Sequence, residues 1–390
     1  MTTLQKTLIT AVILVAVGTG IYEARQPSLL RDQVQALQLQ QAPLAEQLQQ
    51  LQQERDAALK RLAAASAKPA PRLPAPPLKG TAQAGGPLDE LRSTNLYSRV
   101  QNGVQLTAKQ VEPYLKAHRR DAASLLAAYR TTGDSALLTE AMQKYPNAPQ
   151  VALEAAYSKD TSPEAQRQWL ESFKQSAPDN ALPNYLLALN YFKAGQSDQA
   201  VQELIAAFGK PQVQDYFVAR MSDNEEAYLS AGYPPAEAKA LGPEQLPLMP
   251  DRGDLKQLAY DMVDLANSYR QAGDETSAQA ALQMAAHLGH RYESASPGQP
   301  TIDQLLGFRM EKLALGTMEP NSPYGAQGQT VQDRLNQIAQ QYSALQNLVL
   351  QSEPFRKTMP DQDWIGYTDR LKSFGEEAAL RWVLSKYGQK

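Results

Sequence analysis

The stretch LALNYFKAGQSDQAVQELIAA (Leu187–Ala207) shares its spacing with LANSYRQAGDETSAQAALQMAA (Leu265–Ala286), although few residues are identical. When the stretches are aligned on Gly195 and Gly273, the same residue types recur at matching positions. These pairs are Ala188 and Ala266, Tyr191 and Tyr269, Ala200 and Ala278, Leu204 and Leu282, and Ala207 and Ala285. Small residues let two antiparallel helices approach closely, and glycine permits the left-handed backbone that ends a helix. The shared spacing therefore predicts two helix–turn–helix units.

This pattern resembles the tetratricopeptide repeat, a helix–turn–helix unit of ~34 residues. Asn184 and Met262 stand where that family usually has Trp. A looser third copy, SLLAAYRTTGDSALLTEAMQKYP, covers residues 124–146, and a fourth unit contains Trp169. The resemblance implies an all-α solenoid of antiparallel helix pairs that binds protein or peptide partners.

In that family, the partner-facing positions lie on the first helix of each pair. On this chain the resemblance implies the partner-binding residues Tyr185, Leu189, Phe192, Lys193, Val263, Asn267, Arg270 and Gln271. A version of the family that clamps a peptide carboxylate uses Lys, Asn and Arg. Only Asn267 and Arg270 match that set, and Val263 replaces the Lys, so we expect an apolar or mixed groove.

The N-terminus carries a hydrophobic run, LITAVILVAV (residues 8–17), which Lys6 precedes. Residues 7–24 contain no charge except Glu23, and as a helix they would extend about 27 Å. We expect residues 1–25 to anchor the chain in a bacterial inner membrane as a single pass, with the rest in the periplasm. A cleaved signal peptide, with export of the mature chain, is the alternative. A buried soluble helix is a third possibility.

Residues 26–65 carry a heptad pattern. Its a and d positions are Leu30, Val34, Leu37, Gln41, Leu44, Leu48, Leu51, Arg55, Ala58 and Leu62. An apolar stripe of this kind predicts self-association through residues 30–62. Gln41 and Arg55 interrupt the stripe, and Pro43 removes a backbone donor. A dimeric coiled coil and a solvated single helix therefore both remain open.

A Pro-rich segment, SAKPAPRLPAPPLKGTAQAGGP, covers residues 66–87. Polyproline II geometry would extend it to roughly 60 Å, so we interpret residues 66–92 as a spacer rather than a ligand for a signalling domain. The segments VGTGIYEARQ (17–26) and LRDQVQALQLQQAPLAEQLQQLQQERD (30–56) together resemble an anchor-plus-heptad module at the head of bacterial envelope proteins. That resemblance implies membrane attachment.

The helical body divides into TPR-like repeats over 93–245 and a repeat with a C-terminal cap over 246–390. Gly195 and Gly273 lie further apart than two such repeats would place them. The excess matches residues 231–254, which are rich in Pro and Gly. We interpret this stretch as a loop or subdomain boundary, with a functional insertion as the alternative.

The C-terminal part shows helical periodicity without the repeat. VQDRLNQIAQQYSALQNLVL (331–350) predicts one long amphipathic helix. The tail, residues 363–388, predicts two helices separated near Gly375, with an aromatic cap. The cap residues are Trp364, Phe374 and Trp382.

Composition excludes several kinds of chemistry. The chain has 390 residues, no cysteine, three histidines and a net charge of −3, so a thiolate site is excluded and nucleic acid is not an expected partner. His287 and His290 could share a metal ion, but zinc takes three or four ligands. Gly289 indicates a helix end between them, which favours histidines placed at a helix C-terminus.

We therefore expect no catalytic, cofactor-binding or metal-binding residue, and interpret Asp361 and Asp363 as residues at a helix start. The expected function is a membrane-anchored scaffold. Two alternatives remain: an oligomerising spacer, and an enzyme acting on envelope polymers. A deep cleft lined by close carboxylates or by His118, His287 or His290 would favour the enzyme.

Overall fold

The computed structural model describes residues 96–159, 161–244, 250–293, 297–325 and 328–388. Every regular element in these ranges is an α-helix and none is a strand, which confirms the all-α prediction for this part of the chain. The predicted anchor, stalk and spacer over residues 1–92 lie outside these ranges. Among the helices that the structure describes, none has the length and apolar character needed to cross a membrane. The two predicted halves of the body pack as one compact unit.

The chain first forms a short helix and then a row of short helices joined by tight turns. The short helix is α4 (Leu96–Asn102). The row comprises α5 (Ala108–Ala117), α6 (Ala122–Thr132), α7 (Ser135–Lys144), α8 (Pro149–Ala156), α9 (Pro163–Ser176), α10 (Leu182–Lys193) and α11 (Ser197–Phe208). From α6 onward, each even-numbered helix packs against the helix that follows it.

A glycine follows the first helix in each of the two helix–turn–helix units that were aligned on Gly195 and Gly273. Gly195 and Gly273 have φ angles of 70° and 75°, in the left-handed region. The N–H groups of Gln196 and Asp274 donate to the carbonyls of Tyr191 and Tyr269, each at 2.9 Å. The same backbone bond therefore ends the first helix in both units.

The Pro- and Gly-rich residues 231–254 are largely helical, so the loop prediction was wrong for most of them. This stretch contains α13 (Pro235–Glu244) and the start of α14 (Pro250–Gln271). Pro235 and Pro250 stand in first turns, where no backbone donor is lost to the helix. Gly242 allows close packing, since a Cβ there would lie 2.8 Å from the carbonyl oxygen of Met221.

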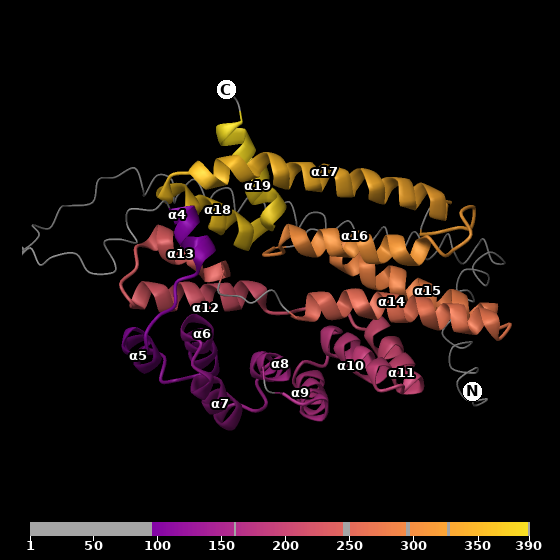
Figure 1. The fold of residues 1–390 in the computed structure, drawn as a ribbon, viewed down its shortest axis with the longest axis horizontal. Helices are drawn as coiled ribbons and strands as arrows, with labels where there is room; N and C mark the ends of the chain where they lie inside the picture. The colour runs from indigo at the N-terminus through magenta and orange to yellow at the C-terminus, as the bar shows by residue number, and fades with distance from the viewer. Residues whose placement is uncertain (1–95, 160, 245–249, 294–296, 326–327, 389–390) are drawn as a thin grey trace, which may run out of the picture. The chain divides into compact units, whose positions relative to one another are not determined.

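Two helices, α12 (Phe217–Ser230) and α14, lie across the row of short helices (Figure 1). Contacts join α12 to α5 and α6, and α14 to α10. On their other side these two helices meet α13, α15 (Glu275–Glu293) and α16 (Thr301–Leu315). The chain therefore covers the first-helix face of its own row.

The C-terminal helices confirm most of the sequence interpretation. The long helix is α17 (Val331–Thr358), and Gly375 separates α18 (Asp361–Phe374) from α19 (Glu376–Tyr387). Trp364 is buried, and Trp382 packs under the guanidinium of Arg370. The cap prediction was wrong for Phe374, whose surface is 67% exposed at the last residue of α18.

Candidate functional site

Three of the residues that the repeat resemblance implies for partner binding are buried. Tyr185 and Leu189 on α10 are each 2% exposed, and Val263 on α14 is 7% exposed. They lie on two helices, α10 and α14, that pack on each other. The Tyr185 hydroxyl also accepts a hydrogen bond from Arg291 at 3.2 Å. The structure thus uses these three side chains in the core and corrects their assignment to a partner surface.

The other five lie at or near the surface and do not form one cluster. Phe192 is half-buried against the core, and Asn267 and Gln271 are exposed. Lys193 pairs with Asp254 at 3.0 Å. Arg270 donates to the carbonyl of Thr317 at 3.0 Å and pairs with Glu275 at 3.3 Å.

An open recess of about 480 Å³ lies where the segment before α12, the end of α15 and the start of α16 meet. We call it the α12–α16 recess. Its lining is mostly apolar, with Tyr216, Phe217, Tyr292, Pro297 and Pro300 contributing rings. Polar groups are interspersed among these rings. They come from Gln212, Asp215, Arg291, Gln299 and Asp303.

The charged side chains of the recess are held by other groups. Arg291 donates to the carbonyls of Ala207, at 3.2 Å, and Lys210, where it complements the C-terminus of α11. Asp303 pairs with Arg252, whose Nη2 lies 3.2 Å from Oδ2. Burial raises the pKa of Asp303, and the bond to Arg252 partly offsets that rise. The recess is therefore preorganised.

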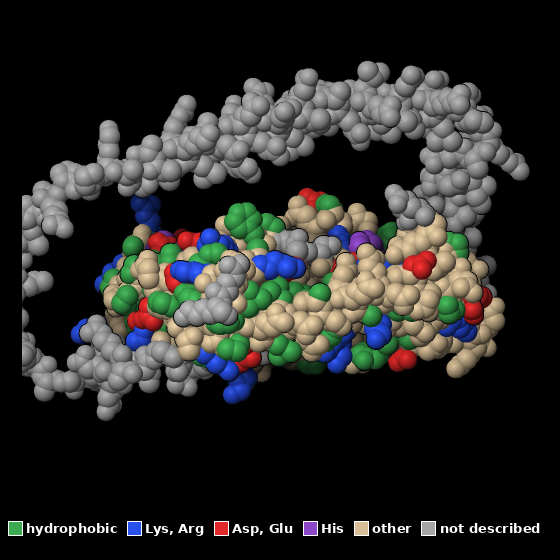
Figure 2. Space-filling view, turned by 90° about the horizontal axis from the view of Figure 1, so that it is seen from above, with side chains coloured by type: hydrophobic (Ala, Val, Ile, Leu, Met, Phe, Trp, Pro, Cys, Tyr) green, Lys and Arg blue, Asp and Glu red, His purple; other side chains and the backbone are tan. Residues whose placement is uncertain are grey.

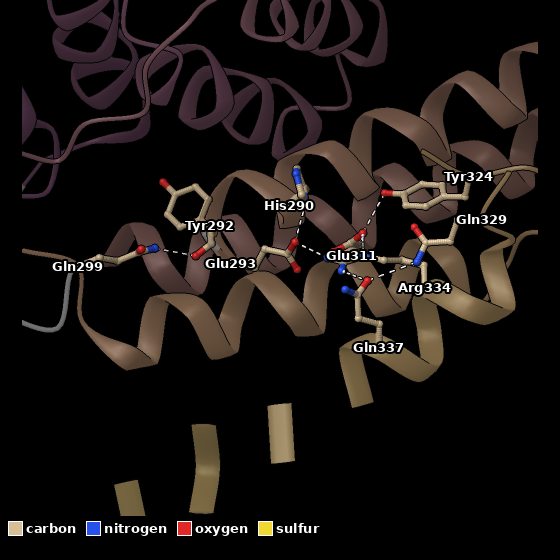
Figure 3. A network of polar contacts seen from close by, with 9 residues as sticks. All are labelled: His290, Tyr292, Glu293, Gln299, Glu311, Tyr324, Gln329, Arg334 and Gln337. Carbon is tan, nitrogen blue, oxygen red and sulfur yellow. Dashed lines mark hydrogen bonds and ion pairs between the residues drawn. The ribbon is translucent and has the colours of Figure 1, made fainter. Parts of the chain in front are cut away.

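A second polar assembly lies between α15, α16 and α17, and we call it the carboxylate network (Figure 3). His290 and Glu293 stand on α15, Glu311 on α16 and Arg334 on α17. Arg334 forms a fork with Glu311 at 2.8 and 2.7 Å and also donates to Glu293. The hydroxyl of Tyr324 donates to Glu311 at 2.9 Å. His290 Nδ1 lies 2.6 Å from Glu293 Oε1.

Glycine brings the two carboxylates together. A Cβ on Gly289 would lie 2.4 Å from the backbone nitrogen of Glu311, and one on Gly307 would lie 2.4 Å from that of Glu293. Neither position accepts a side chain, so α15 and α16 cross with their backbones in close approach. The helix also continues past Gly289 to Glu293, which corrects the predicted helix end between His287 and His290.

Burial and neighbouring charge move the pKa values of the network in different directions. Burial raises the pKa of Glu311, and its contact with Glu293 adds to that rise. Burial alone would raise the pKa of Glu293, but bonds to His290 and Glu311 and the charge of Arg334 lower it. The hydrogen bond to Glu293 raises the pKa of His290. The two carboxyl groups therefore titrate as a pair.

Sequence reasoning noted His290 but missed its partners. His290 and Glu293 are three residues apart on one helix, which was a visible signal. Glu311 and Arg334 had no local signal, because each pairs with residues on another helix.

Comparisons with models of protein families, with curated proteins and with solved structures found no match to this chain.

Proposed function

We propose that this protein is a membrane-anchored scaffold of the bacterial envelope, whose TPR-like helical body binds an extended segment of a protein partner. The observation that supports this proposal is the α12–α16 recess of about 480 Å³. This volume lies within the range of ligand-binding clefts, and its mixed apolar and polar lining is typical of them.

We place the binding site in this recess because other helices cover the first-helix face of the row. In related repeat folds the first helices offer a groove, but here α12 and α14 cover them (Figure 1). The recess instead lies at the ends of helices and next to the irregular segment before α12. Tyr216 and Phe217 supply aromatic lining there, and Gln212 and Gln214 add amide side chains of a type that can bond a peptide backbone.

The charge distribution favours a partner of mixed polarity. On the face shown in Figure 2, acidic and basic side chains are interspersed with hydrophobic ones. The net charge of the whole chain is only −3. A partner recognised here would therefore depend on shape and local hydrogen bonds more than on long-range attraction.

The enzyme and spacer alternatives remain predictions. Asp215 and Asp303 both line the recess, but Arg252 holds Asp303 in an ion pair. The histidines named as markers of an enzyme cleft are not among the lining residues.

A substitution that fills the recess tests the proposal. Ala219 is exposed and lines the recess, so Ala219→Trp should block it without opening a cavity in the core. Ala344→Trp is the matched control, because Ala344 is exposed on α17. We expect capture from gently solubilised membranes to retain specific proteins with the full chain and with Ala344→Trp. Ala219→Trp should lose them by roughly tenfold or more.

Retention of the same proteins by Ala219→Trp would refute binding at this recess. If the full chain captures only its own copies, the scaffold proposal fails and the oligomerising spacer becomes the better explanation.

A further inference from the structure

The carboxylate network holds more negative than permanent positive charge. Glu311 and Glu293 have side chains only 0% and 7% exposed, and among the described residues the permanent cation that pairs with both is Arg334, at 8%. Two buried carboxylates that face a single guanidinium need further positive charge or a proton. His290 can supply a proton, but its side chain is 57% exposed and its charge depends on pH.

One oxygen of this network is buried without a partner. Glu293 Oε1 contacts both His290 and Arg334, whereas Oε2 is buried and has no hydrogen-bond partner. A buried acceptor without a donor costs free energy. Figure 3 shows the Glu293 carboxylate pointing toward His290 and Glu311. A ligand that supplies positive charge at this point would satisfy the oxygen.

We propose that His290, Glu293 and Glu311 bind a divalent transition-metal ion. One imidazole nitrogen and two carboxylate oxygens in these residues lie within 4.8 Å of one another. In a tetrahedral zinc site, bonds of ~2 Å place ligand atoms roughly 3.3 Å apart. The exposed His290 side chain can rotate away from its present 2.6 Å contact with Glu293 Oε1 to reach this spacing.

Arg334 limits the affinity and orients the ligands. Each carboxylate oxygen has two lone pairs, so Glu311 can accept from Arg334 and bind a metal ion at once. The guanidinium would then orient the Glu311 carboxylate through its hydrogen bonds, as partners of metal ligands commonly do. Its charge also repels the metal ion, so the Arg334 side chain acts on metal affinity in two opposite directions.

Titration calorimetry of Zn²⁺ into the purified full chain tests the proposal. We expect one ion per chain and a rise in melting temperature with Zn²⁺. His290→Ala should weaken binding by roughly tenfold or more. We expect this variant to keep the fold, because the His290 side chain is 57% exposed. His118→Ala is the matched control, because His118 also pairs with a glutamate at the surface, Glu226, at 3.0 Å.

Three results would overturn the proposal. The first is no binding of Zn²⁺ at 1:1 stoichiometry, which would mean that a proton alone balances the network. The second is unchanged affinity in His290→Ala. The third is an equal loss in His118→Ala, which would indicate nonspecific binding by surface histidines.

Discussion

At the scale of single residues, glycines determine how closely the helices of this protein pack. Gly289 and Gly307 stand on the facing sides of α15 and α16, and at each of them an added Cβ would meet backbone atoms of the other helix. Sequence reasoning interpreted Gly289 as a helix end, because glycine is a weak helix former. The structure shows that a glycine inside a helix can instead mark a close crossing.

Gly289→Ala should destabilise the protein by about 3 kcal/mol. The new Cβ would lie 2.4 Å from the Glu311 nitrogen, and that backbone atom can move away only if α16 shifts. Gly253→Ala is the control, because nothing lies within 4 Å of a Cβ at that helical position. It should stabilise the protein by about 0.5–1 kcal/mol. Urea denaturation of the two variants measures both effects, and similar midpoints would contradict the close crossing.

At the scale of helices, a buried ion cluster joins α12 to the row of short helices. Glu154 on α8 pairs with Arg130 on α6 at 2.8 Å and with Arg220 on α12 at 3.0 Å. Asn224 on α12 accepts from Arg130 at 2.9 Å. The charges of the two arginines lower the pKa of Glu154 despite its burial, which alone would raise it. These bonds fix the register of α12 on α6 and α8.

Glu154→Gln should cost about 3–5 kcal/mol of folding free energy, because it leaves two buried guanidinium groups without a carboxylate. Glu140→Gln provides the comparison. Glu140 also contacts two cations, Arg120 at 2.5 Å and Lys144 at 2.7 Å, but in a more solvent-accessible setting. Exposed pairs contribute less than about 1 kcal/mol. Equal losses in the two variants, measured by denaturant unfolding, would show that burial of the cluster does not matter.

At the scale of the described body, its first helix, α4, contacts α13 and α18. Arg99 on α4 lies 3.6 Å from Glu237 on α13 and 3.4 Å from Asp361 on α18. Lys372 on α18 pairs with Glu225 on α12, and Lys239 on α13 pairs with Asp369 on α18 at 2.6 Å. A repeat array contacts only its neighbours, whereas these pairs join distant parts of the chain. The body should therefore unfold as a unit.

Tryptophan fluorescence can measure this cooperativity. Trp169 stands on α9, and the other two tryptophans of the chain, Trp364 and Trp382, stand on α18 and α19. One variant would keep only Trp169, and another would replace Trp169 alone by Phe. We expect each variant to unfold in urea in a single transition. After correction for the stability of each variant, the free energy of unfolding should depend on urea concentration with the same slope in both. Two separate transitions would indicate two independent halves.

The sequence predicted the helix pairs but not which of their residues are exposed. Spacing identified α10, α11, α14 and α15 and the two turns within these pairs, because those features depend on residues a few positions apart. Whether a residue can contact a partner depends on whether another helix covers it. Tyr185 and Leu189 have the residue types of a groove, and only the position of α14 made them core residues.

Local patterns in the sequence predict the all-α class, the helix–turn–helix units closed by Gly195 and Gly273, the long α17 and the break at Gly375. These follow from local backbone preferences and from the 3.6-residue period of apolar side chains. The tertiary structure alone decided that α12 and α14 cover the row of short helices, and that Glu293, Glu311 and Arg334 meet. Contacts of this kind join residues far apart in the chain, and their free energy depends on burial, which no local pattern records.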